Sequence, residues 1–155
     1  MYVRQARLID TIELARNIKR GDRDELKASD NVTPLEALVY GFTWQRIDNY
    51  TVIGDTGNII GMFGVRDCIE HPRAGVAYLL SSEELISSAY RLRFLRQCLD
   101  WTEILLQPYD YIYNWVDARN WASLRWLEHC KFEIEETDDA YGYEQRAFHR
   151  LVRRK

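Results

Sequence analysis

The fold of this chain is decided by the stretch Tyr113-Asn-Trp-Val-Asp-Ala-Arg-Asn-Trp-Ala-Ser-Leu-Arg-Trp-Leu-Glu-His-Cys-Lys-Phe132. Its alternating apolar residues up to Val116 predict a strand, which a tight turn follows. The residues Trp121–Cys130 have the spacing of a short amphipathic helix, and Phe132 opens another strand. A strand that leads through one short helix into the next strand is typical of a sheet covered by helices.

The residues just before this stretch predict one more strand and one long helix. Gly75–Leu80 is almost entirely apolar and predicts a buried strand. The helix is expected to begin at Ser82 or Ser88 and to stop before Pro108, because proline cannot continue a helix. Its apolar residues recur every three or four positions: Leu85, Ala89, Leu92, Leu95, Leu99, Thr102 and Leu106.

The first forty residues predict a strand followed by helices. Tyr2–Leu8 alternates as a strand does, and Asp10 is expected to cap a helix that Gly21 ends. Asp22–Ser29 predicts a second short helix. Thr33-Pro-Leu-Glu36 predicts the start of a third, because Thr, Pro and Glu at this spacing form a capping box with proline in the first turn.

The remaining segments predict antiparallel strand pairs. Tyr50–Gly54 and Asn58–Val65 flank the turn sequence Asp-Thr-Gly-Asn and predict a hairpin. Phe132–Glu136 and Glu144–Val152 predict a closing strand pair. We therefore expect one domain over residues 1–155, of α/β (α+β) class, with a mixed, mostly antiparallel central sheet and helices on both faces.

Composition limits the classes of function. The chain is 46% hydrophobic and 29% charged, which is globular, and its net charge of −3 argues against nucleic acid as a partner. No apolar run approaches the roughly 20 residues of a membrane span. Cys68, Cys98 and Cys130 lack metal-ligand spacing and favour reduced thiols in a cytoplasm. We expect most of the tryptophans in the core, with any exposed one marking an interface: Trp44, Trp101, Trp115, Trp121 and Trp126.

The element order over Gly75–Phe132 resembles that of the GNAT (Gcn5-related N-acetyltransferase) family. Asn120 opens the short helix, as an Asn does in that family, and Phe132 stands at the position of the family's closing Phe. The resemblance implies a GNAT-like sheet, acetyl-CoA as cofactor and an amine as acceptor substrate.

A second resemblance is narrower. Trp115, Val116, Asn120 and Ser123–Leu127 are similar to the small GNAT-like internal virion or morphogenesis proteins of T7-group bacteriophages. This resemblance implies a phage origin, a place in the cytoplasm of an infected bacterial host or in the virion, and a host or virion protein as partner.

The GNAT resemblance also implies a cofactor site. In that family a backbone N–H on the strand before the loop polarises the acetyl carbonyl, and a glycine-rich loop at a helix N-terminus binds the pyrophosphate. Small side chains and a nearby Arg follow Glu84 here, although the same residues suit an ordinary helix start with solvated arginines. The implied cofactor-binding residues are Leu79, Leu80, Ser81, Ser87, Ser88, Ala89, Arg91 and Asn120.

Departures from the family pattern leave catalysis open. The loop has no glycine and begins with the acidic Glu84, Leu127 stands where the family's proton-donating Tyr stands, and Lys131 replaces its Gly. His129 is expected at the surface and Cys130 in the core, so no catalytic residue is assigned. Two hypotheses follow: an acetyl-CoA-dependent N-acyltransferase, or a non-catalytic GNAT-fold protein acting in virion assembly or binding a host protein.

Overall fold

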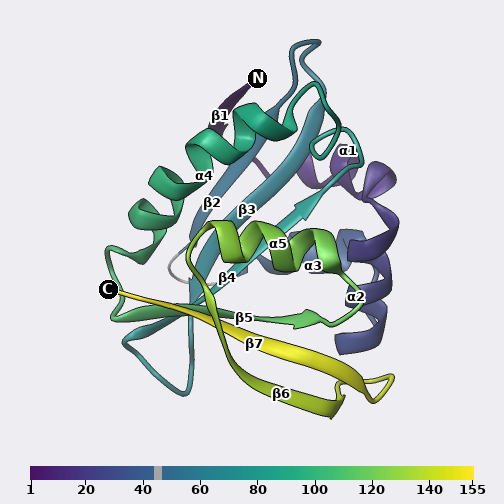
Figure 1. Cartoon of the computed structure of the whole chain (residues 1–155). Coiled ribbons are helices and arrows are strands. Elements are labelled where there is room, and N and C mark those ends of the chain that lie inside the picture. The colour runs from purple at the N-terminus through teal and green to yellow at the C-terminus, as the bar shows by residue number, and fades with distance from the viewer. Residues whose placement is uncertain (44–46) are drawn as a thin grey trace.

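A single seven-stranded sheet forms the centre of the protein, whose computed structural model describes residues 1–43 and 47–155 (Figure 1). Trp44 lies outside the described residues. The strand order is β1-β2-β3-β4-β5-β7-β6, and every pairing is antiparallel except β4 with β5. This confirms the expected mixed, mostly antiparallel sheet. The strands are β1 (Tyr2–Gln5), β2 (Ile47–Ile53), β3 (Ile59–Asp67), β4 (Ala74–Ser81), β5 (Tyr111–Asp117), β6 (Glu133–Tyr141) and β7 (Arg146–Arg154).

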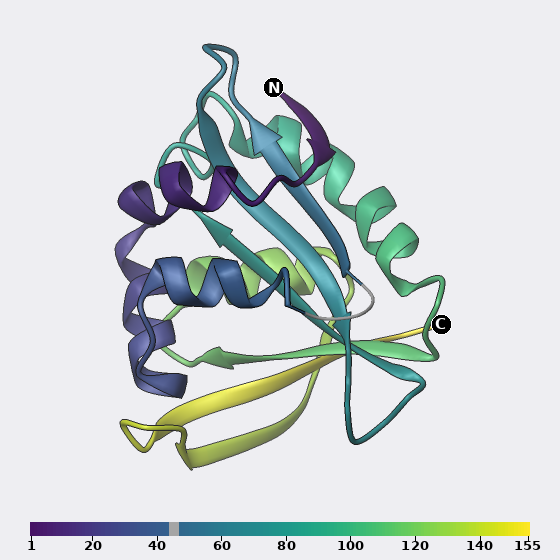
Figure 2. The same ribbon diagram turned by 180° about the vertical axis from the view of Figure 1, so that it is seen from behind.

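Helices cover both faces of the sheet, as expected. In Figure 1 α4 and α5 lie in front of the strands, and the reverse view in Figure 2 shows α1 and α3 in front of them. None of the helices in the described part of the chain is long and apolar enough to cross a lipid bilayer. The helices are α1 (Asp10–Asn17), α2 (Arg20–Asp30), α3 (Pro34–Tyr40), α4 (Arg91–Leu106) and α5 (Trp121–His129).

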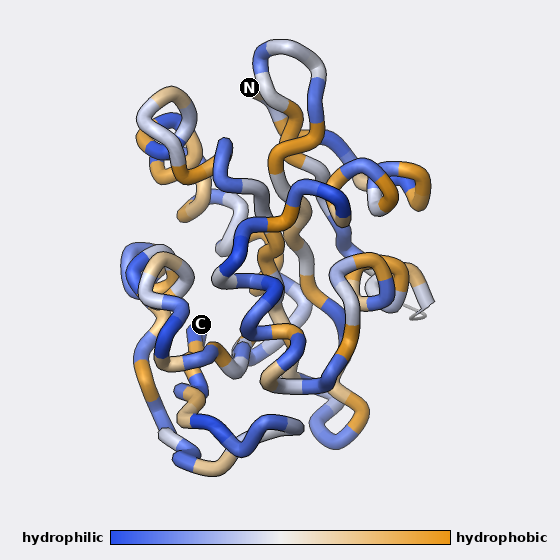
Figure 3. Tube along the Cα trace, turned by 90° about the vertical axis from the view of Figure 1, so that its right-hand side faces the viewer, coloured by the Kyte–Doolittle hydropathy of each residue, from blue (hydrophilic) through white to orange (hydrophobic). Residues whose placement is uncertain are grey.

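Two hydrophobic cores flank the sheet because alternate residues of a strand face opposite sides. Phe63 of β3 packs with Phe94 and Leu127 from α4 and α5, whereas Met62 packs with Leu14 from α1. Burying each such side chain contributes roughly 1.5–3 kcal/mol. Figure 3 shows the hydrophobic stretches along the central strands and a mostly hydrophilic β6–β7 hairpin at the bottom. The β3 strand is therefore held from both faces.

The parallel strands β4 and β5 pair only at one end and then separate. Three pairs join them, the last being Val76 with Tyr113. Beyond that point β4 turns upward and β5 runs to the side (Figure 1). At the closed end Gly75 lies so close to Tyr109 that an added Cβ would stand 2.8 Å from the ring. The two strands thus form a V that opens toward Ser81 and Asp117.

The N-terminal helices depart from two expectations. Asp10 is the first residue of α1 rather than its cap, and its carboxylate accepts hydrogen bonds from Arg4 and from Thr51 on β2. Gly21 does not end α1, which stops at Asn17; it lies in the first turn of α2. A Cβ at Gly21 would stand 3.1 Å from Asn120 Oδ1, so this glycine allows a close approach.

The two helix starts with sequence signals differ in outcome. Thr33 and Glu36 form the predicted capping box at the start of α3. The long helix α4 begins at Arg91, later than either predicted start. Ser82 cannot start the helix because it extends β4, and its N–H donates to Ile60 O of β3 at 3.0 Å. Residues 83–90 then form turns before the helix begins.

One residue at the end of α5 holds an unfavourable backbone conformation. Lys131 has φ 62°, a left-handed conformation that costs a residue with a Cβ roughly 1–2 kcal/mol. A glycine, which the sequence resemblance places at this position, would adopt this conformation without that cost.

We predict that Lys131→Gly raises the free energy of unfolding by roughly 0.5–1 kcal/mol, since glycine adopts this conformation freely but gains entropy when unfolded. Urea denaturation followed by circular dichroism would measure the change. Asn31→Gly is the matched control, because Asn31 has φ 54° at the end of α2 but asparagine tolerates that region. An equal gain in both variants would contradict the strain at Lys131.

Candidate functional site

A cleft of about 360 Å³ lies between α4 and α5, over the open end of the V. The floor includes Leu79 and Ser81 of β4, and the walls include Phe94 of α4 and Trp126 of α5. The alternation of residues along β4 explains why Leu79 and Ser81 form the floor. Since Ser82 is hydrogen-bonded to β3, alternation turns the backbone of Leu80 toward β3 and the backbones of Leu79 and Ser81 toward the gap.

The walls of the cleft are basic. Lys19, Arg91 and Arg125 line it, and none of the described residues that line it is acidic. Arg125 lies over the ring of Trp121, with 5.8 Å between the guanidinium carbon and the ring centroid. Trp121 is 65% exposed, so this stacked pair borders the cleft as an accessible surface. Such a cleft favours an anionic ligand with a planar or apolar portion.

The acidic residue of the preceding turn points away from the cleft. Glu84 Oε2 accepts a hydrogen bond of 2.5 Å from Asn58 Nδ2, at the turn between β2 and β3. Arg93 also turns to that hairpin and pairs with Asp55. The repulsion expected between Glu84 and a bound phosphate is therefore reduced, and Arg91 is the α4 arginine that remains at the cleft.

The predicted binding residues fall into three groups. Leu79, Ser81 and Arg91 line the cleft together. Ser87, Ser88 and Ala89 lie in the turn before α4, where Ser87 is half-buried and the other two are exposed. Leu80 packs into the core on the α1 side, and Asn120 is buried with its side chain toward α2. Whether these residues bind a cofactor stays a prediction.

His129 and Cys130 lie where the sequence placed them. His129 is exposed, and its Nε2 is 3.1 Å from Leu95 O, which ties α5 to α4. Cys130 is fully buried. Hydrogen bonding with Cys98, and then burial, raise the pKa of the Cys130 thiol well above its usual value, so a thiolate nucleophile is not formed there.

The first two turns of α2 close the open end of the V. Ser81 N–H donates to Asp22 Oδ2 at 3.0 Å, and Ser81 O accepts from Lys19 N–H at 2.8 Å. On the opposite strand Asp117 N–H donates to Glu25 Oε2 at 3.1 Å. One helix therefore satisfies backbone groups on both separated strands.

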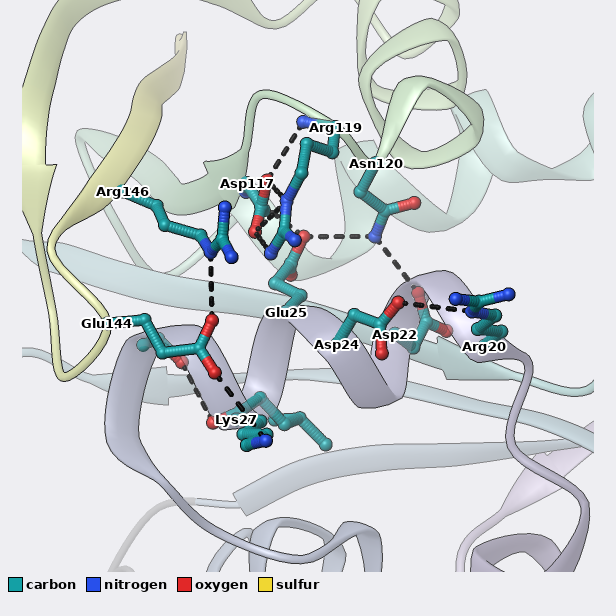
Figure 4. Close-up of polar contacts among 12 residues, drawn as sticks. Arg20, Asp22, Asp24, Glu25, Lys27, Asp117, Arg119, Asn120, Glu144 and Arg146 are labelled. Atoms are coloured by element: carbon teal, nitrogen blue, oxygen red, sulfur yellow. Dashed lines mark hydrogen bonds and ion pairs between the residues drawn. The ribbon is translucent and has the colours of Figure 1, made fainter.

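Asn120 joins the two carboxylates of α2 to each other. Its Nδ2 donates to Asp22 Oδ1 at 3.1 Å and to Glu25 Oε2 at 2.9 Å (Figure 4). Lys19 Nζ pairs with Asp22 as well. We call Asp22, Glu25 and Asn120 the carboxylate bridge. Asn120 stands at the start of α5, but its side chain makes no cap hydrogen bond for that helix and instead bonds to α2.

The two acidic groups at the β5 end carry opposite pKa shifts. Burial, with a further contribution from Asp22, raises the pKa of Glu25 to about 8, against the hydrogen bonds from Asn120 and Asp117. Burial also acts to raise the pKa of Asp117, but the hydrogen bonds from Arg119 outweigh it and the pKa is lowered. Near neutral pH Glu25 is largely protonated, while Asp117 is ionised.

Sequence reasoning missed the carboxylate bridge and part of the cleft. Trp121, Arg125 and His129 stand four residues apart, a spacing that places them on one face of a helix and could have indicated a shared surface. Asp22 and Glu25 also share a helix face. Their shared partner, Asn120, is more than 90 residues away, and no local pattern signals that contact.

Comparison with known proteins shows the fold. No family model and no curated protein sequence matches the chain. The solved structure of ribosomal-protein-S5-alanine acetyltransferase from Vibrio fischeri has a TM-score of 0.68 at 18% identity, covering 98% of this chain and 91% of that one. A GNAT-family acetyltransferase from Bacillus anthracis gives 0.67 at 12% identity, covering 98% and 93%.

A third structure, spermidine N-acetyltransferase from Vibrio cholerae in complex with CoA and spermine, has a TM-score of 0.68 at 16% identity. It covers 99% of this chain and 94% of its own. These likenesses span nearly the whole chain, so the described residues adopt the GNAT fold. The mixed sheet and the order of elements predicted from the sequence agree with that result.

We predict that Asn120→Ala lowers the free energy of unfolding by about 1–3 kcal/mol at pH 7, because two buried carboxyl groups lose a shared donor. Urea denaturation would measure the loss. Asn17→Ala is the control, since the exposed Asn17 amide donates only to Glu13 O within α1. Equal effects of the two substitutions would contradict a structural role for the bridge.

Proposed function

We propose that this protein transfers an acyl group from an acyl-CoA thioester, of which acetyl-CoA is the simplest, to an amine. The observation that carries the proposal is the V between β4 and β5, which opens directly beneath a basic cleft. The backbone N–H of Leu79 faces this gap and would polarise a carbonyl group there. The fold supports the proposal, because acetyltransferases of several kinds share it.

The residues of the cleft fit the chemistry of acetyl-CoA. Arg91 and Arg125 would hold its phosphate groups. The side chains of Ser87–Ala89 are small, so a phosphate could approach the backbone near the start of α4, where the helix dipole favours negative charge. The exposed Trp121 offers a flat surface to the adenine ring. When bound, acetyl-CoA supplies an acyl group that is activated as a thioester.

The acceptor is proposed to be a primary amine. The solved spermidine N-acetyltransferase is in complex with CoA and spermine, which is an amine, and shares this fold. In the present chain the carboxyl groups of α2 lie at the open end of the V, where an amine could hydrogen-bond to them.

A second candidate is a non-catalytic GNAT-fold protein that serves virion assembly or binds a host protein. Two observations favour it. The backbone N–H and C=O of Ser81 are both occupied by α2, and the buried Leu127 cannot transfer a proton from the position of the family's tyrosine. On this candidate the cleft does not hold CoA.

We also propose a phage origin, with the protein acting in the cytoplasm of an infected bacterial host or within the virion. The support is the resemblance of Trp115, Val116, Asn120 and Ser123–Leu127 to the small GNAT-like proteins of T7-group phages. Mass spectrometry of purified virions from a phage that encodes this chain would separate the two locations.

We predict that acetyl-CoA binds the wild-type protein and raises its melting temperature, and that Arg125→Ala or Arg91→Ala weakens binding roughly tenfold through loss of a charge-assisted hydrogen bond. Isothermal titration calorimetry would measure both. Arg96→Ala is the control, because Arg96 is exposed on α4 outside the cleft. No heat and no thermal shift at millimolar acetyl-CoA would overturn the proposal and favour the non-catalytic candidate.

A further inference from the structure

The open V needs a group that can accept a proton, and its own strands offer none that is free. The strand β4 contains no carboxylate and no histidine. On β5 the single carboxylate, Asp117, is ionised but both its oxygens receive hydrogen bonds from Arg119. Burial raises the pKa of Tyr78 on β4 and raises that of Tyr113 on β5 to about 12, so neither phenol is a base near neutral pH.

Glu25 reaches the V from α2. Its Oε2 accepts hydrogen bonds from Asp117 N–H and Asn120 Nδ2, which fix the carboxyl group at the β5 side of the gap. Within the part of the chain that the structure describes, no hydrogen bond is found to Oε1 of Glu25. One oxygen is therefore held in place and the other is left for a ligand.

Along the strands, Glu25 lies within about one residue of the Leu79 N–H that is proposed to polarise the carbonyl group. Strands rise about 3.3 Å per residue, so Leu79 lies about 10 Å and Asp117 about 13 Å beyond the last paired residues, Val76 and Tyr113. Glu25, bonded to Asp117 N–H, stands close to the level of Leu79. The cleft opens on the α4 and α5 side, whereas Glu25 comes from α2 (Figures 1 and 4).

We infer that Glu25 is the general base of the transfer reaction and takes the proton that the acceptor amine loses. This inference rests on the proposed function. The acceptor reacts as the neutral amine, after a cationic form has lost one proton to solvent. In the reaction the amine nitrogen forms a bond to the acyl carbon, and the bond from that carbon to the thioester sulfur breaks. The sulfur leaves with the electron pair of the broken bond and takes a proton from solvent. Glu25 later gives the proton that it accepted from the amine back to solvent.

The surroundings of Glu25 set the pH above which it can act as a base. The groups that face it are Asp22 and Lys19 on its own side, Asp117 with Arg119 at the end of β5, and Tyr141 on β6. Asp22 opposes ionisation of Glu25 and Lys19 favours it, after the larger effect of burial. With a pKa of about 8, Glu25 is mostly protonated at pH 7, and its ionised form, which can accept a proton, becomes the major one above about pH 8.

The test compares Glu25→Gln with Asp24→Asn in full-length protein. Glu25→Gln keeps an acceptor for Asp117 N–H but removes the base, so we expect kcat to fall about 100-fold while acetyl-CoA binding by calorimetry is unchanged. The wild-type kcat is expected to rise with pH and level off above about 8, an inflection that Glu25→Gln loses. Asp24 is the control, because it is exposed on α2 and pairs only with Arg20 at 3.5 Å.

A second readout needs no ligand. A carboxyl group whose folded pKa is raised stabilises the fold below its unfolded pKa, and that contribution is lost as pH rises through the folded value. The wild-type melting temperature is therefore expected to fall between about pH 4.5 and 8 through Glu25, and Glu25→Gln is expected to flatten this part of the curve.

Three outcomes overturn the inference. A Glu25→Gln variant that keeps the wild-type kcat and pH profile would exclude Glu25 as the base while leaving the proposed function intact. Equal pH dependence of the melting temperature in both proteins would show that Glu25 does not titrate as required. A wild-type protein that binds no acetyl-CoA would remove the proposed function and this inference together.

Discussion

Two parallel strands that separate leave backbone hydrogen-bonding groups without a strand partner, and this constraint governs the structure around the V. An unsatisfied buried donor costs roughly 1–3 kcal/mol. Asp22 and Glu25 accept the N–H groups of Ser81 and Asp117, and Asn120 donates to both carboxylates. This arrangement brings the carboxyl groups of Asp22 and Glu25 close together in a place where water is largely excluded. Burial, with a further contribution from Asp22, therefore raises the pKa of Glu25, although the hydrogen bonds from Asn120 and Asp117 oppose the rise.

The two cores explain why the V is held in a definite shape. Helices α4 and α5 pack on one face through Phe94 and Leu127, and α1 and α3 pack on the other through Leu14 and Leu38. A basic cleft lies over the gap on the α4 and α5 side, and the carboxyl groups of α2 close its wide end.

Local patterns predicted the fold well and the site only in part. The capping box at Thr33 and the helix after Asn120 formed as expected because their signals lie within a few residues. The start of α4 was wrong because Ser82 is bound to Ile60 on a neighbouring strand. Leu79, Ser81 and Arg91 do line one cleft. Glu25 was not predicted as a site residue, because a charged residue in a short helix is usually exposed to solvent and nothing in the local sequence marks it as different.

The carboxylate bridge also has a consequence for the order in which the protein folds. Asp22 and Asn120 are 98 residues apart in the chain. Contacts between such distant residues form late, because closing the intervening loop costs entropy before the contact is gained. During synthesis the first 119 residues emerge without the Asn120 amide that donates to both carboxyl groups on α2. The open end of the V is therefore completed only when the C-terminal third of the chain has joined the sheet.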